Sequence, residues 1–194
     1  MGELIPESYV VLLDFEKIFG RTAPLQVDLG CGDGSFLAAL AAQTPQKNFL
    51  GIERLVGRVR TAVRKAARLE NVSVLQVESS YAIRYLLPAR SVEAFHLLFP
   101  DPWPKRRHHR RRIVTPDFLS AVAEALTANG ILRIATDQSD YFKQMRHVAG
   151  QSAKFAANRD DNDDDLPASA FEKRFKKSGA KIYRLELRKV SPVM

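Results

Sequence analysis

The segment 99–112 carries the residues best suited to chemistry, and it reads FPDPWPKRRHHRRR. Asp101 stands between two prolines, which fix the φ angle on either side and remove two amide donors. Residues 105–112 hold six Lys or Arg and no acid, in a chain whose net charge is +8. A dense block of like charge favours contact with a polyanion, and phosphate backbones are the usual partner. We therefore predict that this segment forms the substrate-facing edge of an active site. The alternative is a solvated basic loop.

Length and composition bound the class of protein. A chain of 194 residues with 45% hydrophobic residues can bury one continuous core, so we expect a single domain over 1–194. No stretch reaches about 18 consecutive apolar residues, which predicts no membrane span. The first ten residues lack the basic and apolar regions of a secretory signal, and one cysteine fits a reducing compartment. These features favour a cytoplasmic protein.

Strand and helix patterns alternate along most of the chain. Short apolar runs indicate strands at 25–29, 48–52, 72–77, 92–99 and 131–136. Helical patterns follow them at 35–43, 55–69, 81–87, 115–128 and 139–149, and Asn129-Gly130 is expected to stop the fourth. This alternation predicts an α/β fold with a doubly wound, mostly parallel, seven-stranded sheet of the Rossmann-like type. We also expect a packed helix within 1–20, over 6–19, and an antiparallel edge pair at 154–157 and 181–188, joined only by a loop whose part 158–170 is acidic.

Each of the five expected parallel strands ends in a carboxylate or leads directly into one. These acids are Asp28, Glu53, Glu78, Asp101 and Asp137. The carboxyl ends of parallel strands meet at one edge of a sheet, where open α/β folds bind their ligands. One such acid is commonly just a helix cap, but the regular series predicts a ligand site at this edge.

A glycine-rich turn, GCGDG at 30–34, follows the first expected strand. Its three glycines permit a sharp turn and a close approach of the backbone to a ligand. Glu53, at the end of the next strand, can accept hydrogen bonds from both hydroxyls of a ribose. The diphosphate of NAD would be repelled by the carboxylates of Asp28 and Asp33. S-adenosylmethionine carries a sulfonium and an ammonium and no phosphate, so these acids favour it as the cofactor.

With these motifs, the chain resembles the bacterial tRNA (guanine-N7-)-methyltransferases, which are class I S-adenosylmethionine-dependent enzymes. The likeness is most specific in FPDPWPKRRHHRRR (99–112) followed by TPDFL (115–119). The motifs GIE (51–53), ATD (135–137) and SAFE (169–172) support it. The resemblance implies transfer of a methyl group to N7 of a guanine in tRNA, with S-adenosylmethionine as the cofactor and tRNA as the partner.

The resemblance also implies roles for individual residues. The cofactor would be held by Asp28, Gly30, Gly32, Gly34, Glu53, Glu78, Ser79 and Asp101. Asp101 would also be the catalytic residue at the reaction centre. The guanine nucleotide would be held by Lys105, Asp137, Ser169, Phe171 and Glu172. The RNA would be contacted by Arg106, Arg107, His108, His109, Arg110, Arg111 and Arg112.

Methyl transfer to N7 makes modest demands on a protein. N7 of guanine has a free lone pair and needs no deprotonation, so we expect catalysis by positioning and by a well-placed negative charge. Asp101 on its rigid turn suits that role. A second carboxylate, Asp137 or Glu172, could accept hydrogen bonds from N1 and the amino group of the guanine. The segment PDPWP lacks the adjacent prolines typical of amino-group methyltransferases, which argues against chemistry on an exocyclic amine.

Several alternatives stay open. The chain could be an RNA-binding protein of this fold without catalysis, or a methyltransferase or dehydrogenase for a small metabolite, which would not need the basic run. Trp103 either packs beneath its loop or stacks on a base. His108 and His109 are adjacent instead of four apart, and CxxC is absent, so we expect no metal. The choice between monomer and homodimer is undecided.

Overall fold

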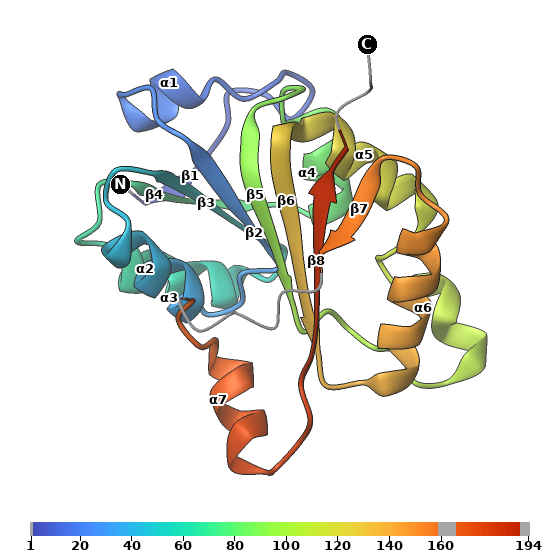
Figure 1. The fold of residues 1–194 in the computed structure, drawn as a ribbon. Coiled ribbons are helices and arrows are strands. Elements are labelled where there is room, and N and C mark those ends of the chain that lie inside the picture. The colour runs from blue at the N-terminus through green and yellow to red at the C-terminus, as the bar shows by residue number, and fades with distance from the viewer. Residues whose placement is uncertain (1, 159–165, 191–194) are drawn as a thin grey trace.

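The computed structural model describes residues 2–158 and 166–190. These residues form one sheet of eight strands with helices on both faces (Figure 1). The strands are β1 (Glu3–Leu4), β2 (Leu25–Leu29), β3 (Asn48–Glu53), β4 (Val72–Gln76), β5 (Val92–Leu98), β6 (Leu126–Thr136), β7 (Phe155–Asn158) and β8 (Tyr183–Lys189). The helices are α1 (Phe15–Phe19), α2 (Ser35–Gln43), α3 (Val56–Ala66), α4 (Ser79–Tyr85), α5 (Pro116–Ala125), α6 (Ser139–Gly150) and α7 (Ala170–Lys177), with a 3-10 helix, η1 (Arg106–Arg111). None of the helices within these ranges is long and apolar enough to cross a bilayer.

The strand order is β1-β4-β3-β2-β5-β6-β8-β7. Strands β1 to β6 run parallel to one another, whereas β8 is antiparallel to both β6 and β7. The predicted α/β class, the parallel sheet and the antiparallel edge pair are thus confirmed. The predicted number of strands is wrong, because Glu3–Leu4 adds an eighth strand by pairing with β4.

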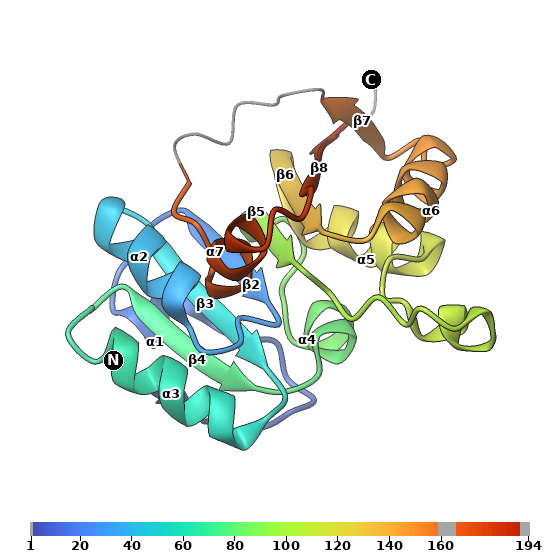
Figure 2. The same cartoon turned by 90° about the horizontal axis from the view of Figure 1, so that it is seen from below.

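The apolar runs of the sequence become strands that are covered on both faces. All five residues of β2 and all six of β3 are buried, as expected where helices pack on either side of a parallel sheet. Helices α2 and α3 cover one face, and α4, α5 and α6 cover the other (Figure 2). The sheet is therefore a rigid frame, and its strand ends are the surface left free for a ligand.

The N-terminal segment does not form the helix predicted over 6–19. Asp14 begins a much shorter helix, α1, because its carboxylate accepts a hydrogen bond from the amide of Lys17 at 3.1 Å. The amide of Leu13 instead donates to the carbonyl of Leu86 at 2.8 Å, which holds the chain extended beside α4. Val10 and Val11 are exposed, so the apolar stripe in the sequence is not one buried helix face.

The predicted end of α5 also differs from the structure. The helix ends at Ala125, and the fully buried Leu126 enters β6 directly, opposite Val92 of β5. Asn129-Gly130 therefore lies inside a strand and does not stop the helix.

The connection between β7 and β8 is more than the predicted loop. Ser169 caps α7, and its hydroxyl accepts a hydrogen bond from the amide of Glu172 at 3.1 Å. The acidic residues 159–165 of the predicted 158–170 loop lie outside the described residues.

Helices α2 and α3 approach each other closely at Gly34, the residue before α2. A Cβ added to Gly34 would lie 2.6 Å from the Cβ of Ala62, and the φ angle of 74° already favours glycine. A Cβ added to Gly30, with the same φ angle, meets no heavy atom within 4 Å. Gly34 therefore serves helix packing, whereas Gly30 leaves space open.

This difference predicts unequal costs of substitution. Gly30→Ala should lower the free energy of unfolding by about 1 kcal/mol through backbone strain. Gly34→Ala should cost about 2–4 kcal/mol, since it adds the overlap with Ala62. Urea unfolding of both variants measures these costs. Adding Ala62→Gly to Gly34→Ala should recover only part of the packing loss, because the Cα of Ala62 would still lie 2.7 Å from the added Cβ. Purely additive effects would show that the Cβ of Ala62 is not an obstacle.

Candidate active site

The glycine turn is held by the end of the neighbouring strand β3. The amides of Gly30 and Cys31 both donate to the carbonyl of Ile52, at 2.8 and 2.9 Å. Gly32, with a φ angle of 58°, has only the Gly30 carbonyl oxygen within 4 Å of an added Cβ, at 3.9 Å. The turn is thus fixed in place, and it leaves open space beside its backbone.

Glu53 ends β3 inside this turn and is only 4% exposed. Its carboxylate accepts hydrogen bonds from the amide of Gly32 at 3.2 Å and from the amide of Leu55 at 2.9 Å. The guanidinium of Arg58, on α3, lies 3.8 Å from the same carboxylate. These contacts hold the carboxylate where β3 ends, as the sequence predicted for a group that faces a ligand.

Asp28 is the second buried carboxylate of the site, with 4% exposure. Burial, together with the negative charge of Glu53, raises the pKa of Asp28 from an ordinary value of 3.8 to about 7. Near neutral pH, Asp28 therefore gains or loses a proton in response to the charge placed beside it.

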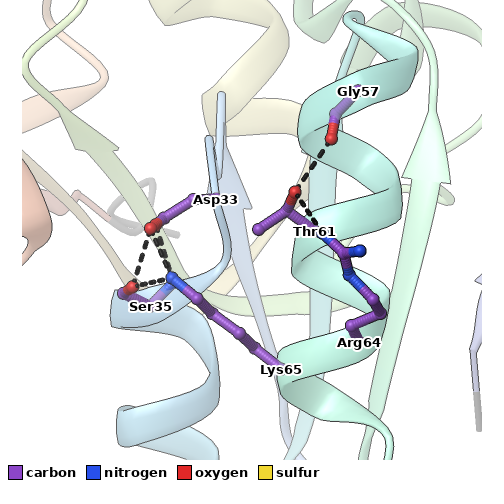
Figure 3. A network of polar contacts seen from close by, with 6 residues as sticks. All are labelled: Asp33, Ser35, Gly57, Thr61, Arg64 and Lys65. Atoms are coloured by element: carbon purple, nitrogen blue, oxygen red, sulfur yellow. Dashed lines mark hydrogen bonds and ion pairs between the residues drawn. The ribbon is translucent and has the colours of Figure 1, made fainter.

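Asp33 has a different environment from Asp28 (Figure 3). Lys65 reaches across from α3 and donates to the carboxylate of Asp33 and to the hydroxyl of Ser35. Burial opposes ionisation of Asp33, but the hydrogen bonds from Lys65 and Ser35 outweigh it and lower its pKa. Because Lys65 offsets the charge of Asp33, repulsion of a diphosphate rests on Asp28 and Glu53.

A cavity of about 250 Å³ opens between the glycine turn and the start of α7. It lies at the strand ends, where the order of the sheet reverses between β3, β2 and β5. Its lining residues are Asp28, Gly30, Cys31, Gly32, Asp33, Phe36, Arg58, Leu98, Ser169, Ala170 and Phe171. The structure thus brings two predicted groups together, the glycine turn and the segment 169–172.

Some of these lining residues were not predicted. Arg58 lies on the helix expected over 55–69, and neither it nor Phe36 nor Leu98 was among the predicted site residues. The capping pattern of Ser169 and Glu172, three residues apart, could have revealed α7.

Five predicted cofactor residues do not line this cavity, namely Gly34, Glu53, Glu78, Ser79 and Asp101. Glu78 is exposed and caps α4, because its carboxylate accepts a hydrogen bond from the amide of Tyr81 at 2.9 Å. The amide of Val77 donates to the carbonyl of Glu53 at 3.2 Å. Glu78 therefore lies at the start of α4, one residue after the contact with Glu53.

Asp101 is exposed on a loop that leaves the end of β5. The loop is strained on both sides of the acid, since Phe99 and Trp103 have φ angles of 54° and 44°. Backbone strain at non-glycine residues persists only where surrounding contacts impose it. This loop is therefore held by its neighbours.

An aromatic cluster joins this loop to α7. The ring centroid of Phe99 lies 6.3 Å from that of Phe171 and 5.3 Å from that of Phe175. Glu172, on the same helix, is 8% exposed, and its carboxylate accepts a hydrogen bond from Arg184 at 2.6 Å and pairs with Lys176 at 2.7 Å. The predicted substrate residues of α7 are thus fixed beside the Asp101 loop.

Asp137 follows β6 directly, at the same edge of the sheet. It is partly buried, and its carboxylate accepts a hydrogen bond from the side chain of Gln138 at 2.5 Å. The adjacent alignment of Leu98 with Ala135 places the ends of β5 and β6 side by side. Asp137 and the Asp101 loop therefore share this end of the sheet.

The basic segment divides into exposed and buried parts. Its exposed members are Lys105, Arg106, Arg107, Arg110 and Arg111. Arg112, by contrast, is only 3% exposed, so its predicted contact with RNA is a wrong assignment for this structure. The guanidinium of Arg112 is occupied inside the protein.

The aromatic and histidine side chains of this segment contact one another. Arg111 lies over the ring of Trp103 at 4.8 Å, and the ring of His108 meets Trp103 edge-on at 5.8 Å. Trp103 therefore packs within its own segment. His108 and His109 are both partly buried. Within 2–158 and 166–190, no group of three or more His, Cys, Asp or Glu could hold a metal ion.

Comparisons with known proteins agree with this geometry. A family model described as "Putative methyltransferase" matches residues 22–185. The tRNA (guanine-N(7)-)-methyltransferase of Leifsonia xyli subsp. xyli is 41% identical, over 91% of this chain and 81% of the relative. The enzyme of the same name from Halorhodospira halophila is 40% identical, over 79% of this chain and 67% of the relative. The crystal structure of the 16S rRNA methyltransferase KamB is similar in fold, with a TM-score of 0.64 and 17% identity over 92% of this chain and 93% of that one.

The fold is that of the class I methyltransferases. Within that class, the chain belongs to the tRNA (guanine-N7-)-methyltransferase family. The predicted family and fold class are both confirmed.

The raised pKa of Asp28 predicts a pH-dependent stability. The folded protein binds this proton more tightly than the unfolded chain, so the contribution of Asp28 is fully present below about pH 4 and is lost as pH rises to about 7. Asp28→Asn cannot ionise. Its Tm relative to that of the parent protein should therefore increase between pH 5 and pH 8, as measured by calorimetry. Asp117→Asn, at an exposed acid of α5, is the control. A Tm difference for Asp28→Asn that does not change with pH would contradict the assignment.

Proposed function

We propose that this protein transfers a methyl group from S-adenosylmethionine to N7 of a guanine in tRNA. The names of its relatives supply the reaction and the substrate class. The observation in the chain itself that carries the proposal is the arrangement of the strand ends. A cavity lined by the buried carboxylate of Asp28 and by the glycine turn lies at the same edge of the sheet as Glu53, Asp101 and an exposed cationic segment. A tRNA substrate would place the enzyme in the cytoplasm.

The residues of the cavity fit S-adenosylmethionine. Gly30 and Gly32 leave space for a ligand against the backbone, and Glu53 has lone pairs that can accept from ribose hydroxyls. The buried carboxylates of Asp28 and Glu53 raise each other's energy while both are ionised, and a cationic ligand relieves that repulsion. When bound, S-adenosylmethionine supplies an electrophilic methyl group, which the lone pair of N7 displaces from sulfur.

Asp101 contributes a negative charge at the centre of this reaction. Positive charge passes to the purine during methyl transfer, and a fixed carboxylate stabilises it without needing to accept a proton. The flanking prolines and the strained residues Phe99 and Trp103 restrict the loop, so the carboxylate needs little reorganisation. Asp137 is a candidate acceptor for N1 and the amino group of the guanine, because it follows the adjacent strand.

The cationic surface around the strand ends fits an RNA backbone. Figure 2 looks onto this end of the molecule, where α7 lies over the central strands and the 106–111 segment projects beyond α5. Helix α7 adds exposed basic residues that the sequence reading did not single out, namely Lys173, Arg174, Lys176 and Lys177. We propose that a structured RNA contacts both elements while one guanine reaches the cavity.

The chemical proposal predicts a selective loss in Asp101→Asn. Incubation with labelled S-adenosylmethionine and unmodified tRNA, followed by nucleoside analysis, should show 7-methylguanosine. The nearly isosteric Asp101→Asn should lower the single-turnover rate at least about tenfold, equivalent to about 1.4 kcal/mol. Asp117→Asn removes a charge elsewhere and should retain the parent rate. Full activity of Asp101→Asn would remove this acid from the mechanism, and a methylated amine in place of 7-methylguanosine would refute the proposed product.

The RNA surface predicts a change in affinity without a change in chemistry. Arg106→Gln combined with Arg110→Gln should raise KM for tRNA and leave kcat near the parent value, because phosphate contacts position the RNA. The log–log slope of RNA affinity against salt should flatten by about 0.9 for each lost contact, if the B-DNA value applies. Arg60→Gln on α3, combined with Arg68→Gln just after that helix, is the charge-matched control. An effect of the α3 pair alone would move the RNA surface to that helix.

A further inference from the structure

Arg112 ends the basic segment but faces into the protein. Its neighbours Arg110 and Arg111 are exposed, whereas Arg112 is 3% exposed. A buried guanidinium is costly unless its donors are paired. The partners of Arg112 therefore indicate its role.

Three directional hydrogen bonds hold the guanidinium. Nε donates to the carbonyl of Pro102 at 2.7 Å, Nη1 to the side-chain oxygen of Gln144 at 2.7 Å, and Nη2 to the carboxylate of Asp140 at 2.5 Å. The guanidinium also lies over the ring of the fully buried Tyr141, 4.6 Å from its centroid. These contacts use the planar, forked shape of arginine, which lysine cannot reproduce.

The partners come from the Asp101 loop and from α6, the helix that follows Asp137. Pro102 is the residue after Asp101, on the strained loop. The other three partners lie on the first turns of α6, the helix that follows Asp137. Burial raises the pKa of Tyr141, and Asp101 makes a smaller contribution in the same direction, which places that acid within electrostatic reach of the cluster.

We infer that Arg112 is a positioning residue, which fixes the Asp101 loop against α6 and so sets the relative placement of Asp101 and Asp137. This inference rests on the proposed function for its catalytic consequence. In this role Arg112 acts through its protein partners and not through a contact of its own with cofactor or RNA. It holds the carbonyl of Pro102, next to Asp101, to which no other side chain of the described residues donates.

The only tryptophan of the chain, Trp103, reports on this loop without any substrate. It follows Pro102 directly, so loss of the Arg112 bond should let the indole move. Acrylamide quenching of its fluorescence in Arg112→Gln should increase by about twofold or more, as expected for local opening. Arg110→Gln removes the same charge from the same segment and should leave the quenching unchanged. Unchanged quenching in a folded Arg112→Gln would overturn the inference, whether or not the protein methylates tRNA.

Kinetics separate positioning from RNA contact. Arg112→Gln should lower the single-turnover rate at saturating tRNA and cofactor by about tenfold to a hundredfold, because small misplacements of a reacting group are costly. KM for tRNA and its salt dependence should stay near the parent values, whereas Arg110→Gln should shift both and spare the rate. Arg112→Lys keeps the charge but not the fork, and it should fail to restore the rate. Recovery with lysine, or a flatter salt slope in Arg112→Gln, would instead identify Arg112 as a phosphate contact.

A milder variant keeps the inference testable if Arg112→Gln does not fold. Gln144→Leu removes one acceptor from α6 and leaves Arg112 in place. It should increase Trp103 quenching and lower the rate in the same direction but to a smaller extent. A parent-like rate and parent-like quenching in Gln144→Leu would count against the link between α6 and the loop. Absence of methyl transfer by the parent protein, with Trp103 released in Arg112→Gln, would refute the proposed function and leave the structural role of Arg112 intact.

Discussion

The carbonyl of Ile52 accepts two amides of the glycine turn, and the rest of the site depends on this junction. The register that pairs Leu29 with Ile52 brings the end of β2 beside the end of β3. Gly30 and Cys31 then donate to the Ile52 carbonyl, and the next residue of β3, Glu53, accepts from the turn as well. The turn, the carboxylate of Glu53 and the sheet therefore share one rigid frame. Open space beside the turn is a consequence of this bonding, because the backbone amides already have partners on the sheet side.

The same frame places two carboxylates where neither is well solvated. Asp28 and Glu53 are each 4% exposed. Because burial and the charge of Glu53 disfavour the ionised form of Asp28, its pKa is raised to about 7. Asp33, within the glycine turn, accepts a hydrogen bond from Lys65 and has a lowered pKa. Lys65 thus pairs with the acid that supports the turn, and Arg58 lies 3.8 Å from Glu53, whereas Asp28 is buried and has a raised pKa.

The sequence predicted the parts of the site that depend on local pattern. Apolar runs marked β2 to β6, and the acids and glycines at their ends needed only the rule that parallel strands end at one edge. The prediction of a helix over 6–19 failed because an apolar stripe does not show which contacts a segment makes, and part of this stripe is exposed. Asp14 caps a short helix there, while Leu13 bonds to α4, and neither contact is visible in a periodicity. Helix α7 was missed because its face contacts a single cluster around Phe99, so the stripe is short.

The basic segment shows most clearly what a residue pattern leaves out. Six cations in eight positions look equivalent in sequence, and their shared charge suggests one role. The fold divides them, because the chain turns inward after η1 and the last residue of the basic segment, Arg112, contacts α6. A loop strained at Phe99 and Trp103 carries about 1–3 kcal/mol of unfavourable energy at each strained position, so it needs contacts from outside itself. The aromatic cluster of α7 holds its first side, and Arg112 holds its second. The rigidity of the Asp101 loop is thus a tertiary property, and the proline residues that mark it in the sequence are only part of its cause.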